Sequence, residues 1–187
     1  MPKKVVILLG SPRKNGNSAT LAAQVAEGAK SAGAKVQSFF LQKMKIAPCN
    51  ACEGCHKKNS KGCVIKDDMQ RIYAALAEAD AVVFATPIYW FTMSAQIKLA
   101  IDRCYALIGS EGFSLEDKRA ALVMTYGAAD PVESGCVNAI RAFQDASRFT
   151  GIRIVGMVYG SAGAAGAIKA NAALMKQARE LGERLVG

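Results

Sequence analysis

Four of the six cysteines lie within one short segment and follow the spacing C-x2-C-x2-C-x7-C. Thiolates at such spacing can wrap a compact loop around one inorganic cluster, and a fourth thiolate completes the ligand set of a [4Fe–4S] centre. A zinc ribbon normally has two separated C-x2-C pairs, and the second pair is missing here. The spacing therefore favours an iron–sulfur cluster and leaves zinc, free thiols or a disulfide as alternatives. The candidate metal ligands are Cys49, Cys52, Cys55 and Cys63.

The remaining cysteines and the single histidine carry no clear signal. His56 adjoins the cysteine segment, and we expect it to be a bystander because a histidine beside a ligand usually binds no metal itself. Cys104 falls on the apolar stripe of an expected helix and Cys136 lies in a polar segment, so both are interpreted as structural. In a reducing compartment, clustered cysteines indicate metal or redox chemistry before disulfides.

A loop rich in hydroxyl and amide side chains follows the first apolar run of the chain. It leads into an expected helix, whose unpaired N–H groups and partial positive charge would stabilise an anion. Gly10 and Gly16 would let the backbone approach that anion closely. Since neither the P-loop nor the G-x-G-x-x-G pattern is present, we expect a loop that holds a terminal phosphate monoester. The alternative is a polar turn with a capping serine. The candidate phosphate contacts are Ser11, Arg13, Asn15, Asn17, Ser18 and Thr20.

Three consecutive aromatic residues, Tyr89, Trp90 and Phe91, follow another apolar run. Aromatic side chains in a loop gain burial and stacking if they cover a flat tricyclic ring such as a flavin. The alternatives are that they close the end of the core or form a dimer contact. A later loop, which begins at Tyr126 and Gly127, would supply a further wall. The candidate ring contacts from these loops are Pro87, Ile88, Tyr89, Trp90, Phe91, Tyr126 and Gly127.

The elements that must position these loops alternate between strand-like and helix-like patterns. Strands are expected at residues 5–9, 35–41, 81–85, 120–125 and 152–158, with the third strand ended by Pro87. Helices are expected at 18–32, from Asp67, from Ser94, at 137–149 and from about Ala167. Asp67 and Gln70 form a capping-box pattern, and Ser94 is a candidate N-cap. Lys98 and Asp102 are spaced to pair on a helix surface.

This alternation predicts an α/β fold, because parallel strands need crossover connections that are usually helices. Five strands fit a flavodoxin-like three-layer sandwich with a five-stranded parallel sheet in the order 2-1-3-4-5. The phosphate loop and the aromatic loop would then emerge together, at the switch point between the first and third strands. We expect a single domain over residues 1–187, with a cysteine-rich insertion at about 42–66.

Composition narrows the class of protein. The chain has 187 residues, of which 51% are hydrophobic and 21% charged, so it can bury a core and is not disordered. Its 24 Lys and Arg against 15 Asp and Glu give a formal net charge of +9, which favours anionic partners such as phosphorylated cofactors. Lys/Arg blocks are no longer than two residues, so we expect no nucleic-acid partner. No apolar run approaches the ~20 residues that cross a bilayer, so we expect a cytoplasmic protein without membrane association.

Taken together, these motifs resemble the NADPH-dependent FMN reductase family, and within it the iron–sulfur flavoprotein branch. The resemblance lies in residues 10–13 through 17–18, the cysteine motif, residues 63–69, residues 86–90, and Lys98 with Asp102 and Arg103. It implies a flavodoxin-like fold that binds FMN non-covalently and assembles as a homodimer or homotetramer. It also implies the phosphate contacts Ser11, Arg13, Asn17, Ser18 and Thr20, the ring contacts at residues 87–91, Thr125 to Gly127 on the far side of the ring, and the four cluster cysteines.

The resemblance further implies an oxidoreductase that takes electrons from NAD(P)H and passes them to a quinone, a flavin or a protein carrier. No catalytic side chain is expected, because the flavin carries the redox chemistry. A second hypothesis is an electron-transfer protein without a small-molecule substrate, fed by a ferredoxin-like donor whose acidic surface would suit the positive charge. A third, a regulatory or nucleic-acid-binding module on the same fold, predicts a colourless protein whose binding to nucleic acid depends on salt.

Overall fold

The computed structural model describes residues 1–109 and 112–187, and its centre is a parallel β-sheet. The strands are β1 (Lys4–Leu9), β2 (Lys35–Phe40), β3 (Ala81–Tyr89), β7 (Arg119–Tyr126) and β8 (Arg153–Ser161). Their order in the sheet is β2-β1-β3-β7-β8, with every neighbouring pair parallel. This is the predicted order. The sheet also has a sixth, short strand that the sequence did not predict, β4 (Thr92–Met93), which pairs antiparallel with the end of β3.

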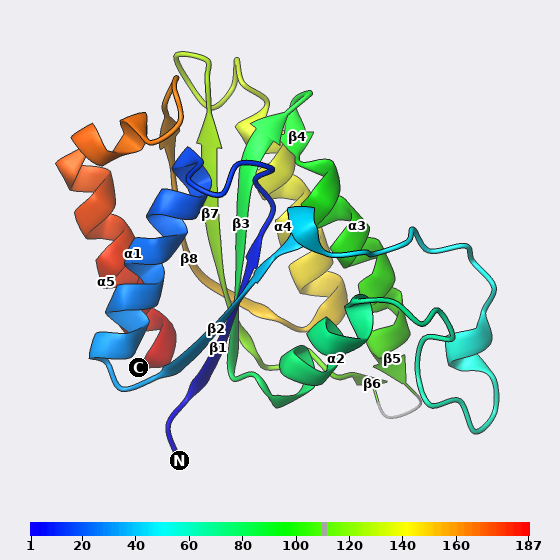
Figure 1. Ribbon diagram of the computed structural model, residues 1–187. Helices are drawn as coiled ribbons and strands as arrows, with labels where there is room; N and C mark the ends of the chain where they lie inside the picture. Colours follow the sequence, from blue (N-terminus) through cyan, green and yellow to red (C-terminus); the bar gives the residue numbers. More distant parts are fainter. Residues whose placement is uncertain (110–111) are drawn as a thin grey trace.

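Helices cover both faces of the sheet and complete the expected three layers (Figure 1). Helices α1 (Asn17–Ser31) and α5 (Ala172–Val186) lie side by side on one face. Helices α2 (Met69–Glu78), α3 (Ala95–Arg103) and α4 (Cys136–Thr150) lie on the other. The 3₁₀ turns are η1 (Leu41–Lys43), η2 (Gly54–His56), η3 (Cys104–Leu107) and η4 (Ala167–Ala170), and two short strands, β5 (Ile108–Gly109) and β6 (Gly112–Phe113), pair antiparallel.

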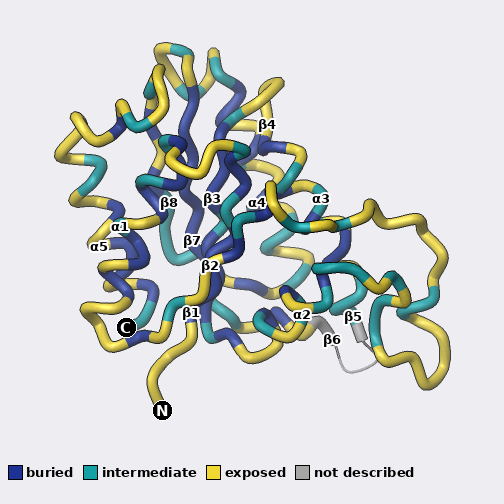
Figure 2. Tube along the Cα trace, viewed as in Figure 1, coloured by how far each residue is buried: buried dark blue, intermediate teal, exposed yellow. Residues whose placement is uncertain are grey.

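The core divides into two clusters because successive strand side chains point to opposite faces. In β1, Val5 and Ile7 pack with α1 and α5, whereas Val6 and Leu8 pack with the layer of α2, α3 and α4. Figure 2 shows the strands buried at the centre and residues 44–68 running outside them as a largely exposed segment. Within the described part of the chain, no helix combines the length and the apolar character needed to span a bilayer.

Helices α1 and α5 cross at a pair of glycines. A Cβ atom on Gly28 would lie 1.9 Å from the Arg179 carbonyl oxygen, and one on Gly182 would lie 2.1 Å from the Val25 carbonyl oxygen. No side chain fits in either place, so the two backbones make direct contact. This contact fixes the axis of α1, and with it the direction in which the N-terminus of α1 points.

Some local predictions were wrong. Strand β3 does not stop before Pro87 but runs to Tyr89. Because β1 ends opposite Ala85, Pro87 has no neighbouring strand on that side of β3 whose hydrogen bonds it could interrupt. The capping box does not form: the side chain of Gln70 donates to the carbonyl oxygens of Cys63 and Ile65, at 3.2 and 2.7 Å. The last α-helix begins at Ala172, after the 3₁₀ turn η4.

Candidate functional site

The loops that follow β1, β3, β7 and β8 meet at the carboxyl ends of these strands, and we call this edge the rim. A cavity of about 190 Å³ opens there. Most of the predicted cofactor contacts line it, namely Ser11, Arg13, Asn17, Ser18, Pro87, Ile88, Tyr89, Thr125, Tyr126 and Gly127. A second cavity of about 290 Å³ shares Ile88, Tyr126 and Gly127 with the first and is also lined by Trp90 and Phe91. The rim therefore offers two adjoining hollows, one between hydroxyls and one beside aromatic rings.

The first hollow lies at the N-terminus of α1. The N-cap residue of that helix is Gly16, and no described side chain caps it, so the N–H groups of its first turn point to the hollow without a side-chain acceptor. A Cβ atom on Gly16 would lie 2.4 Å from Ser11 Oγ, so only glycine fits at that position without moving the hydroxyl. Ser18 is buried, and its Oγ has no hydrogen-bond partner among the described residues. A buried hydroxyl without a partner costs about 1–3 kcal/mol unless a ligand satisfies it.

A buried hydroxyl network joins the loop after β1 to the loop after β3. Ser94 Oγ donates to the Gly10 carbonyl oxygen at 2.8 Å, and the backbone N–H of Ser94 donates to Thr86 Oγ1 at 2.9 Å. Ser94 is the N-cap residue of α3, as expected, but its hydroxyl caps the neighbouring loop instead of its own helix. Neither Thr86 nor Ser94 was predicted as a site residue. Their network holds the two loops in register.

The aromatic residues form a strained hairpin between β3 and β4. Trp90 and Phe91 have φ values of 46° and 63°, in the left-handed region that glycine and asparagine normally occupy in such two-residue turns. The turn packs against the start of α4: Asn138 Nδ2 donates to the Phe91 carbonyl oxygen, and a Cβ atom on Gly135 would lie 2.5 Å from Phe91 Cα. Trp90 is 92% exposed, so its position brings the fold no burial. Strain without burial is typical of a residue kept for binding.

The far walls of the rim come from the loops after β7 and β8. A Cβ atom on Gly127 would meet nothing within 4 Å, so the space beside it is open to a ligand. The loop after β8 was missed: Ala162, Gly163 and Ala165 line the first hollow through their backbone and small side chains.

Three of the predicted phosphate contacts differ from their expected surroundings. Asn17 lines the first hollow, but its Nδ2 donates to the carbonyl oxygen of Ala164 at 3.0 Å and its Oδ1 accepts from the N–H of Ile168. It thus holds the loop after β8 against α1. Asn15 and Thr20 lie outside the residues that line the two hollows.

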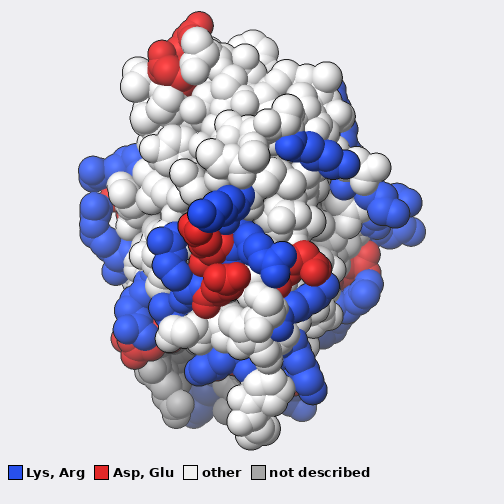
Figure 3. Space-filling model, turned by 90° about the vertical axis from the view of Figure 1, so that its left-hand side faces the viewer, with Lys and Arg blue, Asp and Glu red and all other residues white. Residues whose placement is uncertain are grey.

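Charge is sparse at the rim. In Figure 3, which faces the α1 and α5 side, Lys and Arg side chains are spread among Asp and Glu over the lower and middle parts of the face, and the rim end at the top is mostly uncharged. The formal charge of +9 is therefore not focused into the hollow. The cation that lines it is Arg13, whose guanidinium suits phosphate oxygens. An open helix N-terminus, an unpaired buried hydroxyl and one arginine together fit a phosphate monoester, and the adjoining aromatic hollow fits a flat ring.

The second candidate site is the cysteine loop, residues 44–68, which projects from the side of the molecule beyond α3, away from the rim loops (Figure 1). One small cavity of about 20 Å³ is lined by all four predicted metal ligands, Cys49, Cys52, Cys55 and Cys63. Cys49 and Cys52 are exposed, whereas Cys55 and Cys63 are half-buried. His56 stacks on Tyr105, with ring centroids 4.4 Å apart, which accounts for it without a metal. Cys104 and Cys136 are buried free thiols in the core, as expected.

Arg103, at the end of α3, reaches this cavity although its side chain is only 1% exposed. Its Nη1 lies 2.6 Å from Asp67 Oδ2, and its Nη2 lies 3.4 Å from Cys63 Sγ. Burial alone would raise the pKa of Cys63, but hydrogen bonds from the Ile65 backbone and from Arg103 outweigh it and lower the pKa. At Asp67 burial would likewise raise the pKa, and hydrogen bonds from Arg103 and from backbone N–H groups lower it. Cys63 is thus the cysteine with the strongest support for its thiolate.

The cysteine loop meets only part of what a metal centre requires. Four thiols around one cavity are the donor set that an iron–sulfur cluster takes. Across residues 1–109 and 112–187, however, no group of three Cys, His, Asp or Glu side chains is close enough together to hold a metal ion. The sulfur atoms therefore have to move inward before they could share a cluster. The exposed segment from Cys49 to Cys55, with left-handed backbone at Ala51 and Glu53, is the part with room to do so.

Comparison with known proteins agrees with this geometry. The profile of a family described as NADPH-dependent FMN reductase matches residues 3–187. An iron-sulfur flavoprotein from Methanosarcina thermophila is 31% identical over 153 residues, which are 82% of this chain and 77% of the relative. An iron-sulfur flavoprotein from Archaeoglobus fulgidus is 37% identical over 57% of this chain, and the match spans about half of that relative, 53%. Among solved structures, an NAD(P)H:quinone oxidoreductase from Methanothermobacter marburgensis has the same fold, with a TM-score of 0.75 at 19% identity over 99% of this chain and 100% of the other.

Proposed function

Because the chain belongs to the NADPH-dependent FMN reductase family and is therefore an oxidoreductase, we propose that it binds FMN at the rim, with the phosphate in the first hollow and the isoalloxazine ring in the second. The observation that carries this proposal is the buried, unpartnered hydroxyl of Ser18 beside the uncapped N-terminus of α1. A phosphate there satisfies both, since it accepts hydrogen bonds from hydroxyl and N–H groups.

Each wall of the rim has a part in holding the cofactor. Arg13 and the hydroxyls of Ser11 and Ser18 bind the phosphate, together with the N–H groups of the first turn of α1. Trp90 and Phe91 cover one side of the ring, and Gly127 leaves room for it on the other. The hydroxyls of Thr86 and Ser94 keep the two loops at a fixed separation, so phosphate and ring contacts are made together.

Bound FMN supplies hydride and single-electron transfer, and NAD(P)H is the proposed donor. The protein's own task is then to bind and orient, which agrees with a rim whose lining residues include no Lys, His or Cys. The proposed acceptor is a quinone, another flavin or a protein carrier. The open hollow beside Trp90 and Phe91 gives a flat acceptor access to the ring.

Flavin binding is tested by titrating flavin-free protein with FMN and following flavin fluorescence. We expect Arg13→Ala to weaken binding about tenfold, which is ~1.4 kcal/mol. The matched control is Lys14→Ala, which removes an equally exposed cation one residue away that does not line the hollow. Equal losses in the two variants would show that only long-range charge matters and would contradict the proposed phosphate site. A protein that takes up no FMN at all would refute the function.

A second candidate function is electron transfer without a small-molecule substrate. It is favoured by the positive surface around the cysteine loop, where Lys57, Lys58 and Lys61 are exposed and suit an acidic donor. Anaerobic stopped-flow reduction separates the two functions. Rapid flavin reduction by NADH or NADPH, followed by turnover with a quinone, supports the reductase. Slow reduction by both nucleotides, with fast and salt-sensitive reduction by a ferredoxin, supports the carrier.

The four cysteines are proposed to hold a [4Fe–4S] cluster, which would supply one-electron transfer beside the two-electron flavin. The support is the donor set around one cavity and the family relatives named iron-sulfur flavoprotein. Anaerobic reconstitution with iron and sulfide, followed by iron analysis and a visible spectrum, tests this. We expect Cys52→Ser to lose the iron and Cys136→Ala, which alters a buried core cysteine, to keep it. Protein that binds FMN but takes up no iron would leave a cluster-free reductase.

A further inference from the structure

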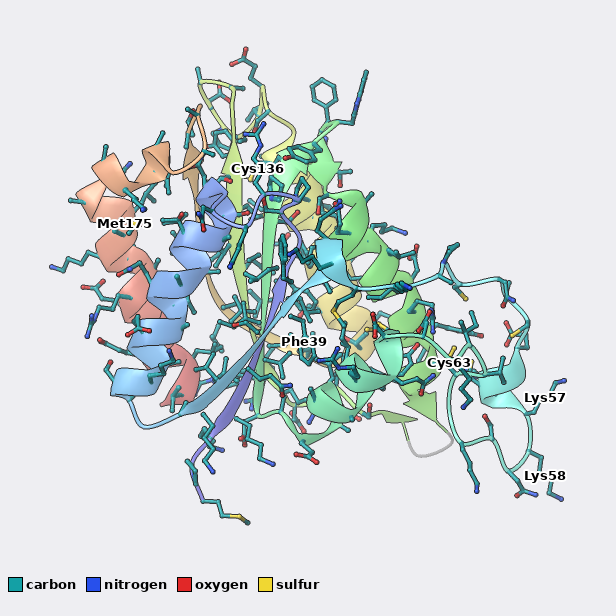
Figure 4. All side chains as sticks on the ribbon, viewed as in Figure 1. Phe39, Lys57, Lys58, Cys63, Cys136 and Met175 are labelled. Atoms are coloured by element: carbon teal, nitrogen blue, oxygen red, sulfur yellow. The ribbon has the colours of Figure 1, made fainter. Side chains whose placement is uncertain are left out.

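The cysteine loop is closed at its base by contacts between its two ends. The N–H of Lys45 donates to Asp68 Oδ2 at 2.8 Å, and the N–H of Asp68 donates to the Lys45 carbonyl oxygen at 3.0 Å. The N–H of Ala47 donates to Asp67 Oδ2 at 2.9 Å. Residues 45–47 and 67–68 therefore form a short neck, and every ligand cysteine lies beyond it. Figure 4 shows Lys57 and Lys58 at the far end of the loop and Cys63 on its inner side, near α2 and α3.

One side chain from outside the loop joins both sides of this neck. Arg103 Nη1 donates to the Ala47 carbonyl oxygen at 2.7 Å and to Asp67 Oδ2 at 2.6 Å, while Nη2 reaches Asp67 Oδ1 at 3.2 Å. The guanidinium thus binds the segment before Cys49 and the segment after Cys63 at the same time. The end of α3 is itself held by Tyr73, whose hydroxyl donates to the Arg103 carbonyl oxygen at 2.8 Å. The neck is fixed to two helices of the fold through Arg103.

The same guanidinium also faces the ligand cavity. Arg103 Nη2 lies 3.4 Å from Cys63 Sγ, within the range of a hydrogen bond to sulfur. Its Nε–H is buried and has no partner among the described residues. An N–H aimed at a ligand sulfur both orients that sulfur and favours its negative charge. The other three cysteines have no comparable anchor in the described structure, and Cys49 and Cys52 are exposed.

From these contacts we infer that Arg103 is the positioning residue of the cysteine site: it closes the neck of the loop and holds Cys63 toward the other three cysteines. Cys63 is the fixed ligand, and the segment from Cys49 to Cys55 moves onto it when the site loads. This inference deepens the proposed cluster site and rests on it only for the identity of what is loaded. The closing of the neck and the orientation of Cys63 are properties of the protein alone.

Closing of the neck is tested in metal-free, FMN-bound protein by amide hydrogen exchange at Lys45, Ala47 and Asp68, the N–H groups that cross the neck. In Arg103→Gln we expect exchange at these amides to be about tenfold faster or more. The guanidinium contacts are absent in this variant, so opening of the neck costs less free energy. Exchange in β1 and α1 stays unchanged. The matched control is Lys98→Gln on the same helix, which removes only an exposed pair with Asp102. Unchanged exchange at the neck in Arg103→Gln would overturn the inference.

Orientation of Cys63 is tested by mild diamide oxidation, which converts two neighbouring thiols to a disulfide, and mass mapping of the products. Wild-type protein should give disulfides from Cys63 to Cys52 or Cys55. Arg103→Gln should instead pair the cysteines among 49, 52 and 55, which a general loss of stability would not select. In Arg103→Lys the single ammonium can still donate to Asp67 and to the Ala47 carbonyl oxygen but cannot also reach Cys63, so this variant should restore slow exchange and not the disulfide pattern. A wild-type disulfide pattern in Arg103→Gln would overturn the positioning of Cys63.

Loss of FMN uptake would show that Arg103→Gln fails to fold. In that case Arg103→Lys is the test variant, and it must alter the disulfide pattern while it still binds FMN. Iron content after reconstitution separates this inference from the proposed function. Wild-type protein without iron refutes the cluster and leaves the neck to be judged by exchange. If wild-type protein takes up iron, and Arg103→Gln takes up equal iron with an unopened neck and the same disulfides, the inference about Arg103 is refuted and the proposed cluster is not.

Discussion

The rim and the cysteine loop both gather residues suited to redox chemistry, but they are held in place in different ways. The rim is formed by the ends of parallel strands, so its loops start from positions that the sheet hydrogen bonds already determine. The cysteine loop leaves the sheet after β2 and returns at α2, with one 3₁₀ turn, η2, as the regular element in its described residues. Its position depends on the neck contacts and on Arg103.

The difference concerns how many independent contacts hold each site. At the rim, the Gly28–Gly182 crossing, the hydroxyls of Thr86 and Ser94, and the contact of Gly135 with Phe91 each hold a separate loop or helix. No single change there should disturb the whole. In the cysteine loop one ion pair, Arg103 with Asp67, bridges the two sides of the neck, while Gln70 and Tyr105 hold single points further along the loop. The proposed cofactor site at the rim is thus preformed, whereas we expect one substitution to open the neck of the cysteine loop.

The largest expected effect comes from breaking that ion pair at its acid. Asp67→Asn leaves the buried Arg103 without its charge partner and should lower the free energy of unfolding by about 3 kcal/mol. Urea unfolding measures this, and FMN affinity should stay within about twofold, since a preformed rim does not use the loop. A large loss of FMN affinity in a variant that is otherwise folded would contradict the independence of the two sites.

The pair also has a pH signature. The pKa of Asp67 in the folded protein is lowered from its ordinary value of 3.8: burial would raise it, and hydrogen bonds from Arg103, Ala47 and Met69 outweigh the burial. A carboxyl group with a lowered folded pKa contributes stability that is present above its ordinary pKa and is lost as the pH falls through the folded pKa. Acidification below about 4 should therefore cost wild-type protein more stability than Asp67→Asn. Parallel curves for the two proteins would show that this pair does not contribute.

The next effect disrupts the rim and leaves the cysteine loop intact. Gly16→Val places a Cβ where 2.4 Å separates it from Ser11 Oγ and 3.2 Å from the Arg13 carbonyl oxygen, so the phosphate loop has to move. We expect FMN binding to weaken about 100-fold, or ~2.7 kcal/mol, by fluorescence titration. Hydrogen exchange at the Lys45 and Ala47 amides should be unchanged. Binding within about threefold of wild type would mean that the phosphate does not sit in this loop.

Much of this layout could be predicted from the sequence, because it depends on local patterns. Continuous apolar runs and helical stripes predicted the α/β fold, and the flavodoxin-like strand order that five strands fit is the one observed. The rule that loops meet at the carboxyl ends of parallel strands predicted that the loops of Ser11 and Tyr89 lie together, and both residues line one hollow. The cysteine spacing predicted an iron–sulfur cluster; the four cysteines line one cavity, but within the described residues no three of them are close enough together to hold a metal ion. The proposed roles of these residues in binding remain predictions.

What the sequence could not predict depends on contacts between distant segments. Ala162 and Gly163 carry no reactive group and line the hollow only because β8 lies next to β7. From the sequence, Asn17 was expected to bind phosphate, but its side-chain oxygen accepts a hydrogen bond from the N–H of Ile168 in η4. Arg103 lies at a helix end, where arginine is usually solvated, and its burial follows from the cysteine loop folding over it. The available signal was the presence of both Asp67 and Arg103 within the segments that resemble the family.

A smaller effect sharpens the assignment of the phosphate hollow. Ser18→Ala removes a buried hydroxyl that has no partner among the described residues, so the flavin-free protein should be as stable as wild type or slightly more so. FMN binding should weaken about tenfold, ~1.4 kcal/mol, because the phosphate loses one donor. Ser31→Ala on the same helix is the control: it removes a hydrogen bond to the Gly28 carbonyl oxygen and should leave FMN affinity unchanged. Loss of stability in flavin-free Ser18→Ala would mean that the hydroxyl has a structural partner instead.

The smallest effect concerns the aromatic hairpin, the one part of the rim that is strained. Trp90 adopts φ of 46° while 92% of its surface stays exposed, so the fold bears a backbone cost of about 1 kcal/mol with no packing in return. Asparagine tolerates this conformation, so Trp90→Asn should raise the free energy of unfolding of the flavin-free protein by about 1 kcal/mol. FMN affinity should fall about threefold, because the ring loses part of its cover. Phe149→Ala, an exposed aromatic on α4 with helical backbone, should change neither quantity. If Trp90→Asn is stabilised and its FMN affinity is undiminished, the strained turn holds Trp90 for a contact other than the flavin. The rim would then have a second binding partner besides FMN.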